Sequence, residues 1–297
     1  REDPPVPGVQ VMAQQVMAQH NGIVDGHLHV WSLDAARYPW QPVAGIKPPT
    51  NEGSAEFLLD QMAEAGVQHA CIVQPSAYGW DHTYVAETLR RYPGRFVGAC
   101  LVDPLSGDEA PRRLEQLTQQ HGFQGLRLNP AAYQGGTWLD EPATHPLWRK
   151  AAQLGTIVSL LIRPEQMRRA ETMIAKHPDV RVIIDHLGRP AVKEGPPYAG
   201  FQDTLRLARY PNTYVKVSGI PVVSQQEYPY RDVWPVIRLV LDAWGPERLM
   251  WATDFPHIVR QCGYQRCLEL VTEHLDCLTA TDREWLLVRT AHSLWRF

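Results

Sequence analysis

Eight strand-like segments that alternate with helical segments predict an α/β fold for residues 23–297, a single (β/α)8 TIM barrel. Each strand-like segment is a short apolar run rich in β-branched residues. Each is followed by a stretch whose apolar residues recur at helical spacing. No G-x-G-x-x-G follows the first strand, which argues against an open doubly wound sheet. The alternation is continuous, so we expect one barrel domain.

The predicted strands share an apolar centre and, in most cases, a polar residue at the carboxyl end. They are residues 23–30, 69–75, 96–102, 123–129, 156–162, 180–186, 213–219 and 248–254. Helix punctuation separates them. Ser54 precedes one helical segment and Gly66 follows it, and a final helix is expected to begin at Thr281 with Glu284 completing a capping box. Residues 1–22, rich in proline and glutamine, are expected to form a flexible arm with no chemical role.

Composition narrows the classes of partner. The formal net charge is −3 with no dense Lys/Arg run, so we expect neither nucleic acid nor an anionic membrane as partner. A small molecule is the expected partner, and a homo-oligomer is compatible with the sequence. No apolar run reaches the length of a membrane span. Five cysteines without C-x-x-C spacing favour reduced thiols and a soluble protein of the cytoplasm, or of an organelle stroma if a preceding segment carried a transit peptide.

The first predicted strand carries the most informative motif. Ile23 to Trp31 reads I-V-D-G-H-L-H-V-W. Alternation along a strand is expected to place Asp25, His27 and His29 on one side, where two imidazoles could reach a common cation. Gly26 allows a close approach by a neighbouring segment. A pair of core or surface histidines is the alternative interpretation.

Polar residues also stand at the ends of later strands, where a barrel gathers its chemistry. They are Gln74, Arg127, Asn129, Arg163, Asp185, His186, Lys216, Ser218 and Asp254. So many buried charges indicate a function, because an unpaired buried charge is costly. Several alternatives stay open for individual residues. Arg127 could form a structural ion pair, Lys216 could point outward under a helix, and Asp254 could cap a helix. Asp185 is expected to point away from His186, and His257 is expected to be a loop histidine.

Five motifs in order together resemble one family. They are D-G-H-L-H-V-W, G-L-R-L-N-P, I-I-D-H-L-G-R-P, Y-V-K-V-S-G and R-L-M-W-A-T-D-F-P. The chain from about Ile23 to Phe297 resembles the amidohydrolase-related family of the amidohydrolase superfamily, and within it the lactonase branch. The resemblance implies a barrel enzyme in which His27, His29, His186 and Asp254 are catalytic and can bind a metal. It also implies that Arg127 binds a substrate carboxylate or carbonyl.

The sequence departs from the binuclear members of that superfamily. The fourth strand has no lysine that could bridge two metals and the fifth has no histidine, so we expect one divalent ion, zinc or manganese, or none. The leading hypothesis is hydrolysis of a small, carboxylated lactone with Asp254 as general base. Gln74, Asn129, Arg163 and Lys216 join Arg127 as candidate substrate ligands. A metal-dependent decarboxylase of an aromatic or muconate-like acid is the alternative, and a non-catalytic acid-binding barrel is a third. Aromatic residues at 78–80, 133–138 and 222–230 could cover a substrate ring.

Overall fold

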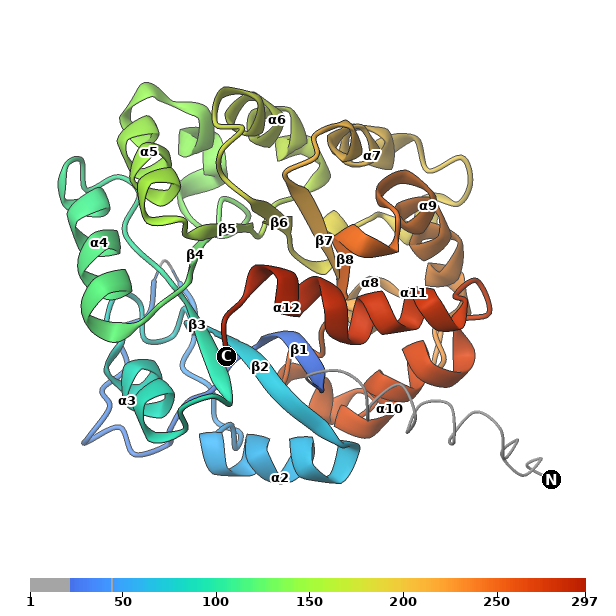
Figure 1. Ribbon diagram of the computed structural model, residues 1–297, viewed down its shortest axis with the longest axis horizontal. Coiled ribbons are helices and arrows are strands. Elements are labelled where there is room, and N and C mark those ends of the chain that lie inside the picture. Colours follow the sequence, from blue (N-terminus) through green and yellow to red (C-terminus); the bar gives the residue numbers. More distant parts are fainter. Residues whose placement is uncertain (1–21, 44) are drawn as a thin grey trace.

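Eight parallel strands form the inner layer of the molecule and helices surround them (Figure 1). The computed structural model describes residues 22–43 and 45–297, so the predicted arm at 1–22 lies outside the described residues except for Gly22. The strands pair in chain order from first to last, as the predicted (β/α)8 barrel requires. They are β1 Ile23–Leu28, β2 Val67–Val73, β3 Phe96–Cys100, β4 Gly125–Leu128, β5 Ile157–Leu160, β6 Val182–Ile184, β7 Thr213–Val217 and β8 Leu249–Trp251.

The ring closes where the chain leaves β8 and meets the end of β1. The Asp254 N–H donates to the His27 carbonyl over 2.9 Å, and the His29 N–H donates to the Phe255 carbonyl over 2.7 Å. Gly26 makes this approach possible, as expected from the sequence. A Cβ at that position would lie 3.0 Å from the Trp251 carbonyl oxygen. The closure therefore holds His27 of β1 and His29, which follows β1, beside Asp254.

The helices largely follow the predicted punctuation. Their bounds are α2 Ala55–Ala65, α3 Thr83–Arg91, α4 Glu109–His121, α5 His145–Leu154, α6 Met167–Lys176, α7 Gln202–Arg206, α8 Ile220–Val223, α9 Trp234–Trp244, α10 Tyr264–Glu269, α11 Ala280–Glu284 and α12 Thr290–Leu294. Ser54 caps α2 by accepting from the Phe57 N–H over 3.2 Å.

The predicted start of the C-terminal helical region is wrong by two residues. Thr279, not Thr281, is the cap, and Asp282 is its capping-box partner. The Thr279 hydroxyl accepts from the Asp282 N–H over 3.2 Å, while the Asp282 carboxylate accepts from the Thr279 N–H over 2.8 Å. The predicted pair, Thr281 and Glu284, has the same three-residue spacing as the observed pair. The backbone is extended at Thr279, as in a capping residue, so the helix begins directly after it.

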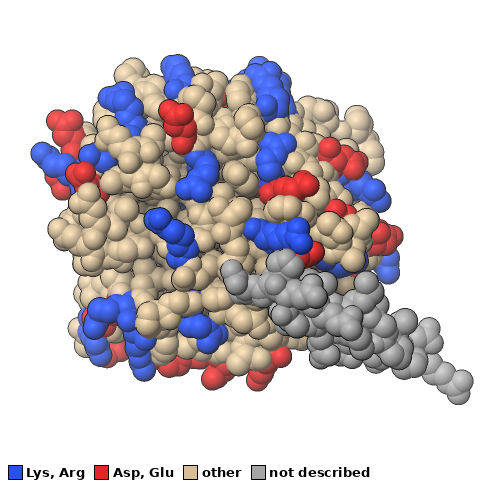
Figure 2. Space-filling model, in the orientation of Figure 1, with Lys and Arg blue, Asp and Glu red and all other residues tan. Residues whose placement is uncertain are grey.

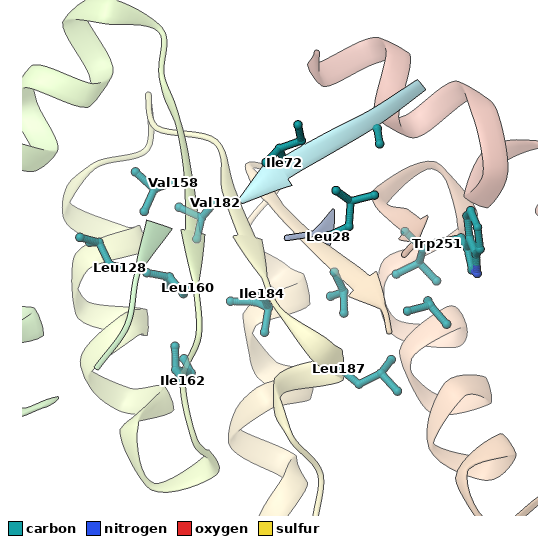
Figure 3. Close-up of a cluster of buried hydrophobic side chains, with 14 of the residues drawn as sticks. Leu28, Ile72, Leu128, Val158, Leu160, Ile162, Val182, Ile184, Leu187 and Trp251 are labelled. Atoms are coloured by element: carbon teal, nitrogen blue, oxygen red, sulfur yellow. The ribbon is translucent and has the colours of Figure 1, made fainter. Parts of the chain in front are cut away.

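The core has two layers, one inside the barrel and one around it. Inward-facing residues of the strands, including Val24, Cys71 and Val97, form the inner cluster, and Trp295 closes it below α12. Figure 1 shows α12 lying across this end of the barrel. The outer cluster fills the space between strands and helices, where Figure 3 shows Leu128, Leu160 and neighbouring side chains. Chemistry is therefore confined to the opposite end of the barrel.

The surface and the cysteines fit the sequence expectations. All five cysteines are free, and Cys71 and Cys100 are buried in β2 and β3. Acidic and basic side chains are interspersed on the face shown in Figure 2. Among the described helices, none is long and apolar enough to cross a bilayer.

Candidate active site

His27 of β1 and His29 just after it meet at the mouth of the barrel, and their neighbour Asp25 turns the other way. The His27 and His29 Nε2 atoms lie 3.3 Å apart. The expectation that Asp25 shares their side is wrong, because the strand register shifts between Asp25 and Leu28. The Asp25 carboxylate instead accepts hydrogen bonds from the Thr253 hydroxyl at 2.5 Å and from the Tyr264 hydroxyl at 3.0 Å. Asp25 thus secures the segment that precedes Asp254.

Asp254 lies at the centre of three imidazoles. Its Oδ1 atom is 3.4 Å from His29 Nε2, 3.7 Å from His27 Nε2 and 4.0 Å from His186 Nε2. That oxygen is buried and accepts no hydrogen bond from any residue that the structure describes. The four residues that the sequence singled out as catalytic therefore come together, and one of them holds an oxygen without a hydrogen-bond partner.

Unusual backbone geometry brings His186 and Asp254 into this cluster. Their φ angles are 53° and 63°, in the left-handed region that is uncommon for residues with a side chain. Because β6 ends at Ile184 and the chain turns sharply at His186, the expectation that Asp185 points away from His186 is wrong. Both side chains enter the barrel. Gly219 makes room for this turn, since a Cβ there would lie 2.8 Å from the His186 Cβ.

Below the mouth, Asp185 is the centre of a buried ion network. Its two oxygens lie 2.9 Å from Lys216 Nζ and 3.0 Å from Arg127 Nε. Lys216 is fully buried, and its ammonium also lies 3.0 Å from His27 Nδ1 and 3.1 Å from Ser159 Oγ. The Lys216 ammonium thus has two hydrogen-bond partners and, in Asp185, an ion-pair partner. Lys216 therefore points into the barrel rather than outward, and Arg127 does form the ion pair considered from the sequence.

The surroundings set the protonation of these groups. Burial alone would raise the pKa of Asp254, but His186, His29 and His27 outweigh it and hold that pKa below its usual range. Burial lowers the pKa of His186 to about 4 and that of His27 well below its ordinary value, with Lys216 adding to the shift at His27. At neutral pH, Asp254 is therefore ionised, and the imidazoles of His27 and His186 are neutral.

The other predicted substrate ligands occupy different positions around the mouth. The Gln74 amide donates to the Asp81 carbonyl over 2.6 Å, which fixes the loop after β2. Asn129 and Arg127 line a hollow beside β4, and the Asn129 Oδ1 accepts from the Ala132 N–H. Arg163 is exposed just after β5.

Three residues near the site were not assigned a role from the sequence. The Ser218 hydroxyl lies 2.9 Å from His186 Nδ1 and orients that ring. Arg189 is half-buried, and burial followed by the charges of Arg127 and Arg163 lowers its pKa. The His257 ring lies 5.5 Å from the His29 ring, centroid to centroid. The sequence could have indicated a role for Arg189, because the motif G-R-P places this arginine three residues after a histidine at the end of a strand.

The geometry suits one divalent ion. Ligand atoms at about 2.0 to 2.1 Å from a tetrahedral zinc are roughly 3.3 to 3.5 Å apart, close to the spacings around Asp254 Oδ1. His29 Nδ1 lies 2.8 Å from the Val73 carbonyl, so its Nε2 carries the lone pair that binds metal. The residues that fit an ion are His27, His186 and Asp254, with His29 beside them and His257 nearby. Lys216 is the feature that competes, because its ammonium occupies His27 Nδ1.

The barrel thus gathers two histidines at the end of β1, one after β6 and an aspartate after β8. The amidohydrolase family model matches residues 24–297, and the chain belongs to that family. The protein is an amidohydrolase-type hydrolase. The five motifs that suggested this family from the sequence therefore identified it correctly.

Several individual proteins are similar to this chain over most of its length. The chain is 26% identical over 243 residues to L-fucono-1,5-lactonase of Burkholderia ambifaria, covering 81% of this chain and 82% of that protein. It is 25% identical over 236 residues to 4-sulfomuconolactone hydrolase of Hydrogenophaga intermedia, covering 80% and 75% respectively. A proposed 2-pyrone-4,6-dicarboxylic acid hydrolase of Pseudomonas putida superposes with a TM-score of 0.78 and 26% identity, covering 93% of this chain and 97% of that one.

Proposed function

We propose that the protein hydrolyses the ring ester of a small, carboxylated lactone. The observation that carries the proposal is the Asp254 Oδ1, which is ionised, has no hydrogen-bond partner among the described residues and faces three imidazoles at 3.4 to 4.0 Å. An ionised oxygen held in this way can accept a proton from water. The names of the lactone-hydrolysing relatives support a lactone as the substrate.

The reaction follows from these positions. Asp254 takes a proton from a water molecule, and the water oxygen bonds to the lactone carbonyl carbon. The ring C–O bond then breaks, and the proton on Asp254 passes to the departing ring oxygen. The product is an open hydroxy acid. Proton transfer by a positioned group contributes roughly 100 to 10,000-fold to such a rate.

The arginines at the mouth provide the complementary charge. Arg127 offers its terminal nitrogens to a substrate carboxylate or to the developing oxyanion, because Asp185 occupies only its Nε atom among the described residues. Arg189 and Arg163 add positive charge on the same side. Ser218 keeps the His186 ring oriented toward Asp254.

A divalent ion such as zinc or manganese, held by His27, His29, His186 and Asp254, would polarise the carbonyl and lower the pKa of bound water toward about 7. The residues of the chain keep the same tasks with or without it. Asp254 holds the proton, and the arginines hold the anionic part of the substrate.

Replacement of Asp254 by asparagine tests the proposal. We expect Asp254→Asn to lower kcat/KM on the best lactone by at least about 100-fold, with an unchanged circular dichroism spectrum and melting temperature. Asp242→Asn, a change on α9 outside the mouth, is the matched control. Normal lactone hydrolysis by Asp254→Asn would contradict the mechanism.

Product analysis separates this function from the decarboxylase alternative. Mass spectrometry of the reaction with a lactone acid should show addition of water and no release of CO₂. Loss of CO₂ from an aromatic or muconate-like acid, abolished by the same substitution, would assign the site to a lyase instead.

A further inference from the structure

An apolar hollow lies beside Arg127, at the edge of the polar cluster. It is partly open to solvent and is bordered by loops that follow β1, β2, β3 and β4. Its apolar walls include Val43, Ile46, Trp80, Leu101, Tyr133 and Trp138. Arg127 belongs both to this hollow and to the ion pair with Asp185.

The aromatic residues of the wall present rings rather than polar groups. The Tyr133 hydroxyl donates to Asp103 Oδ1 over 3.2 Å, and the Trp138 indole N–H donates to the Tyr133 carbonyl over 2.8 Å. Tyr133 meets Trp80 edge-to-face with centroids 6.0 Å apart. These polar atoms are already bonded within the protein, so they contribute little to a ligand in the hollow.

The wall is also fixed in place. The backbone carbonyl of Trp80 lies 2.9 Å from His82 Nδ1, and His82 Nε2 accepts from the Leu101 N–H at 3.1 Å. Gln74 holds the carbonyls of Gly79 and Asp81 on either side of Trp80. A preformed apolar surface of this kind selects by shape and by the absence of polar groups on the ligand.

Few polar side chains line the hollow. Ser76, Asn129 and Arg127 are its polar lining residues, and the Asn129 oxygen already accepts from the Ala132 N–H over 3.1 Å. A substrate with several hydroxyls would leave most of them without hydrogen-bond partners there, which is costly. An aromatic or alkyl group would instead bury apolar surface at no such cost.

We propose that this hollow selects lactones that carry an aromatic or alkyl substituent, and disfavours polyhydroxylated sugar lactones. The inference rests on the proposed function and specifies its substrate class. The substituent fills the space between Trp80, Leu101 and Trp138, while the carboxylate or carbonyl of the ring contacts Arg127. Selection therefore comes from the loops, and the chemistry comes from the strand ends.

Three matched substrates test the selection. Each is a γ-butyrolactone with one ring carboxylate, and they differ only in a second substituent, which is hydrogen, phenyl or dihydroxyethyl. We expect kcat/KM to be highest for phenyl and lowest for dihydroxyethyl, with a ratio on the order of 10 to 200-fold between them. A preference for the dihydroxyethyl lactone would overturn the inference while leaving lactone hydrolysis intact.

A substitution in the hollow tests where the selection arises. Ala132 lines the hollow and is exposed, so Ala132→Trp fills the space without disturbing the core. The phenyl-to-hydrogen ratio of kcat/KM should fall toward one. Leu105→Trp is the matched control, because Leu105 is exposed on the loop after β3 and does not line the hollow. It should retain the wild-type ratio, and an equal ratio in Ala132→Trp and the wild type would place selection elsewhere.

A binding measurement keeps the two proposals separable. If no lactone is turned over, the proposed function fails, and the hollow is then tested with 3-phenylpropanoate and gluconate by quenching of tryptophan fluorescence. Binding of 3-phenylpropanoate that is weakened in Ala132→Trp, with no binding of gluconate, supports the inference. Equal binding of both acids, or binding of neither, contradicts it.

Discussion

Two carboxylates at the ends of barrel strands have opposite environments. Asp185 is fully buried, with Lys216 and Arg127 within 3.0 Å of its oxygens. Asp254 lies one level higher and is partly exposed, and its Oδ1 accepts no hydrogen bond from the described residues. Both have a pKa below the usual range of aspartate. The difference lies in their partners, because two buried cations contact Asp185, whereas three imidazoles and the mouth of the barrel surround Asp254.

We call the surroundings of Asp185 the lower level of the barrel and those of Asp254 the upper level, and the two levels have different roles. The lower level pairs the Asp185 carboxylate with two buried cations and so stabilises the strands around it. The upper level keeps a charged oxygen available for a ligand, a proton or a cation. Substitutions should therefore separate stability from activity, and the lower level should give the largest change in stability.

Asp185→Asn should produce that largest change. Removing this charge leaves Lys216 and Arg127 buried without their anion, which costs about 3 to 5 kcal/mol of unfolding free energy. Urea unfolding at neutral pH measures the loss. Asp254→Asn, measured alongside, should have an unfolding free energy within about 1 kcal/mol of the wild type, because this substitution leaves no surrounding charge unpaired. Equal losses in the two variants would remove the distinction between the levels.

His82, which holds Trp80 and Leu101 in the wall of the hollow, should contribute to the acid sensitivity of the fold, as should His27 and His186 at the mouth. Burial lowers the pKa of His82 to about 4 from its ordinary 6.5, so the unfolded chain binds a proton at this residue more readily than the folded one does. Stability contributed by neutral His82 is complete above pH 6.5 and is lost as the pH falls toward 4. The loss amounts to about 3 kcal/mol. Asp185 contributes no slope in this window, because its pKa lies well below 3.8.

The contribution of His82 can be isolated by comparing how the unfolding free energies of the wild type and of His82→Gln depend on pH. Burial raises the pKa of Asp25 to about 6, so Asp25 contributes stability in the opposite direction as the pH falls from 6 to 3.8. That contribution is common to both proteins and cancels in their difference. Unfolding free energies at pH 7, 5.5 and 4.5 should therefore fall more steeply for the wild type. Parallel pH profiles would refute the assignment to His82.

Much of the site could be predicted from the sequence because strand order alone determines it. In a parallel barrel the ends of β1, β4, β6 and β8 share one rim, so His27, Arg127, His186 and Asp254 converge once the strands are identified. Local backbone geometry could not be predicted in the same way. The register shift that turns Asp25 outward and the left-handed turn that admits Asp185 both break the alternation that a regular strand implies.

Contacts between side chains of distant segments also could not be predicted from the sequence. Lys216 and His27 are 189 residues apart, and their pairing depends on how the side chains stack inside the barrel. The apolar hollow depends on loops whose aromatic residues were visible in the sequence, although their arrangement was not. Trp80, Tyr133 and Trp138 line the hollow, whereas Tyr228 and Tyr230 line a separate one beside β7.

Lys216 joins the two levels, and its replacement tests how far they are coupled. Its ammonium donates to His27 Nδ1, which leaves the ring proton on Nε2 and opposes metal binding there. His27 Nδ1 already lies 3.4 Å from Asp185 Oδ1. In Lys216→Met we expect Nδ1 to donate to that oxygen, which frees Nε2 to act as a ligand. We expect zinc affinity, measured by competition with a chromophoric chelator, to rise roughly 10 to 100-fold. Lys150→Met, which removes a surface ion pair with Glu115, should leave it unchanged. Zinc bound as tightly by the wild type as by Lys216→Met would show that Lys216 does not control His27, and the two levels would then act independently.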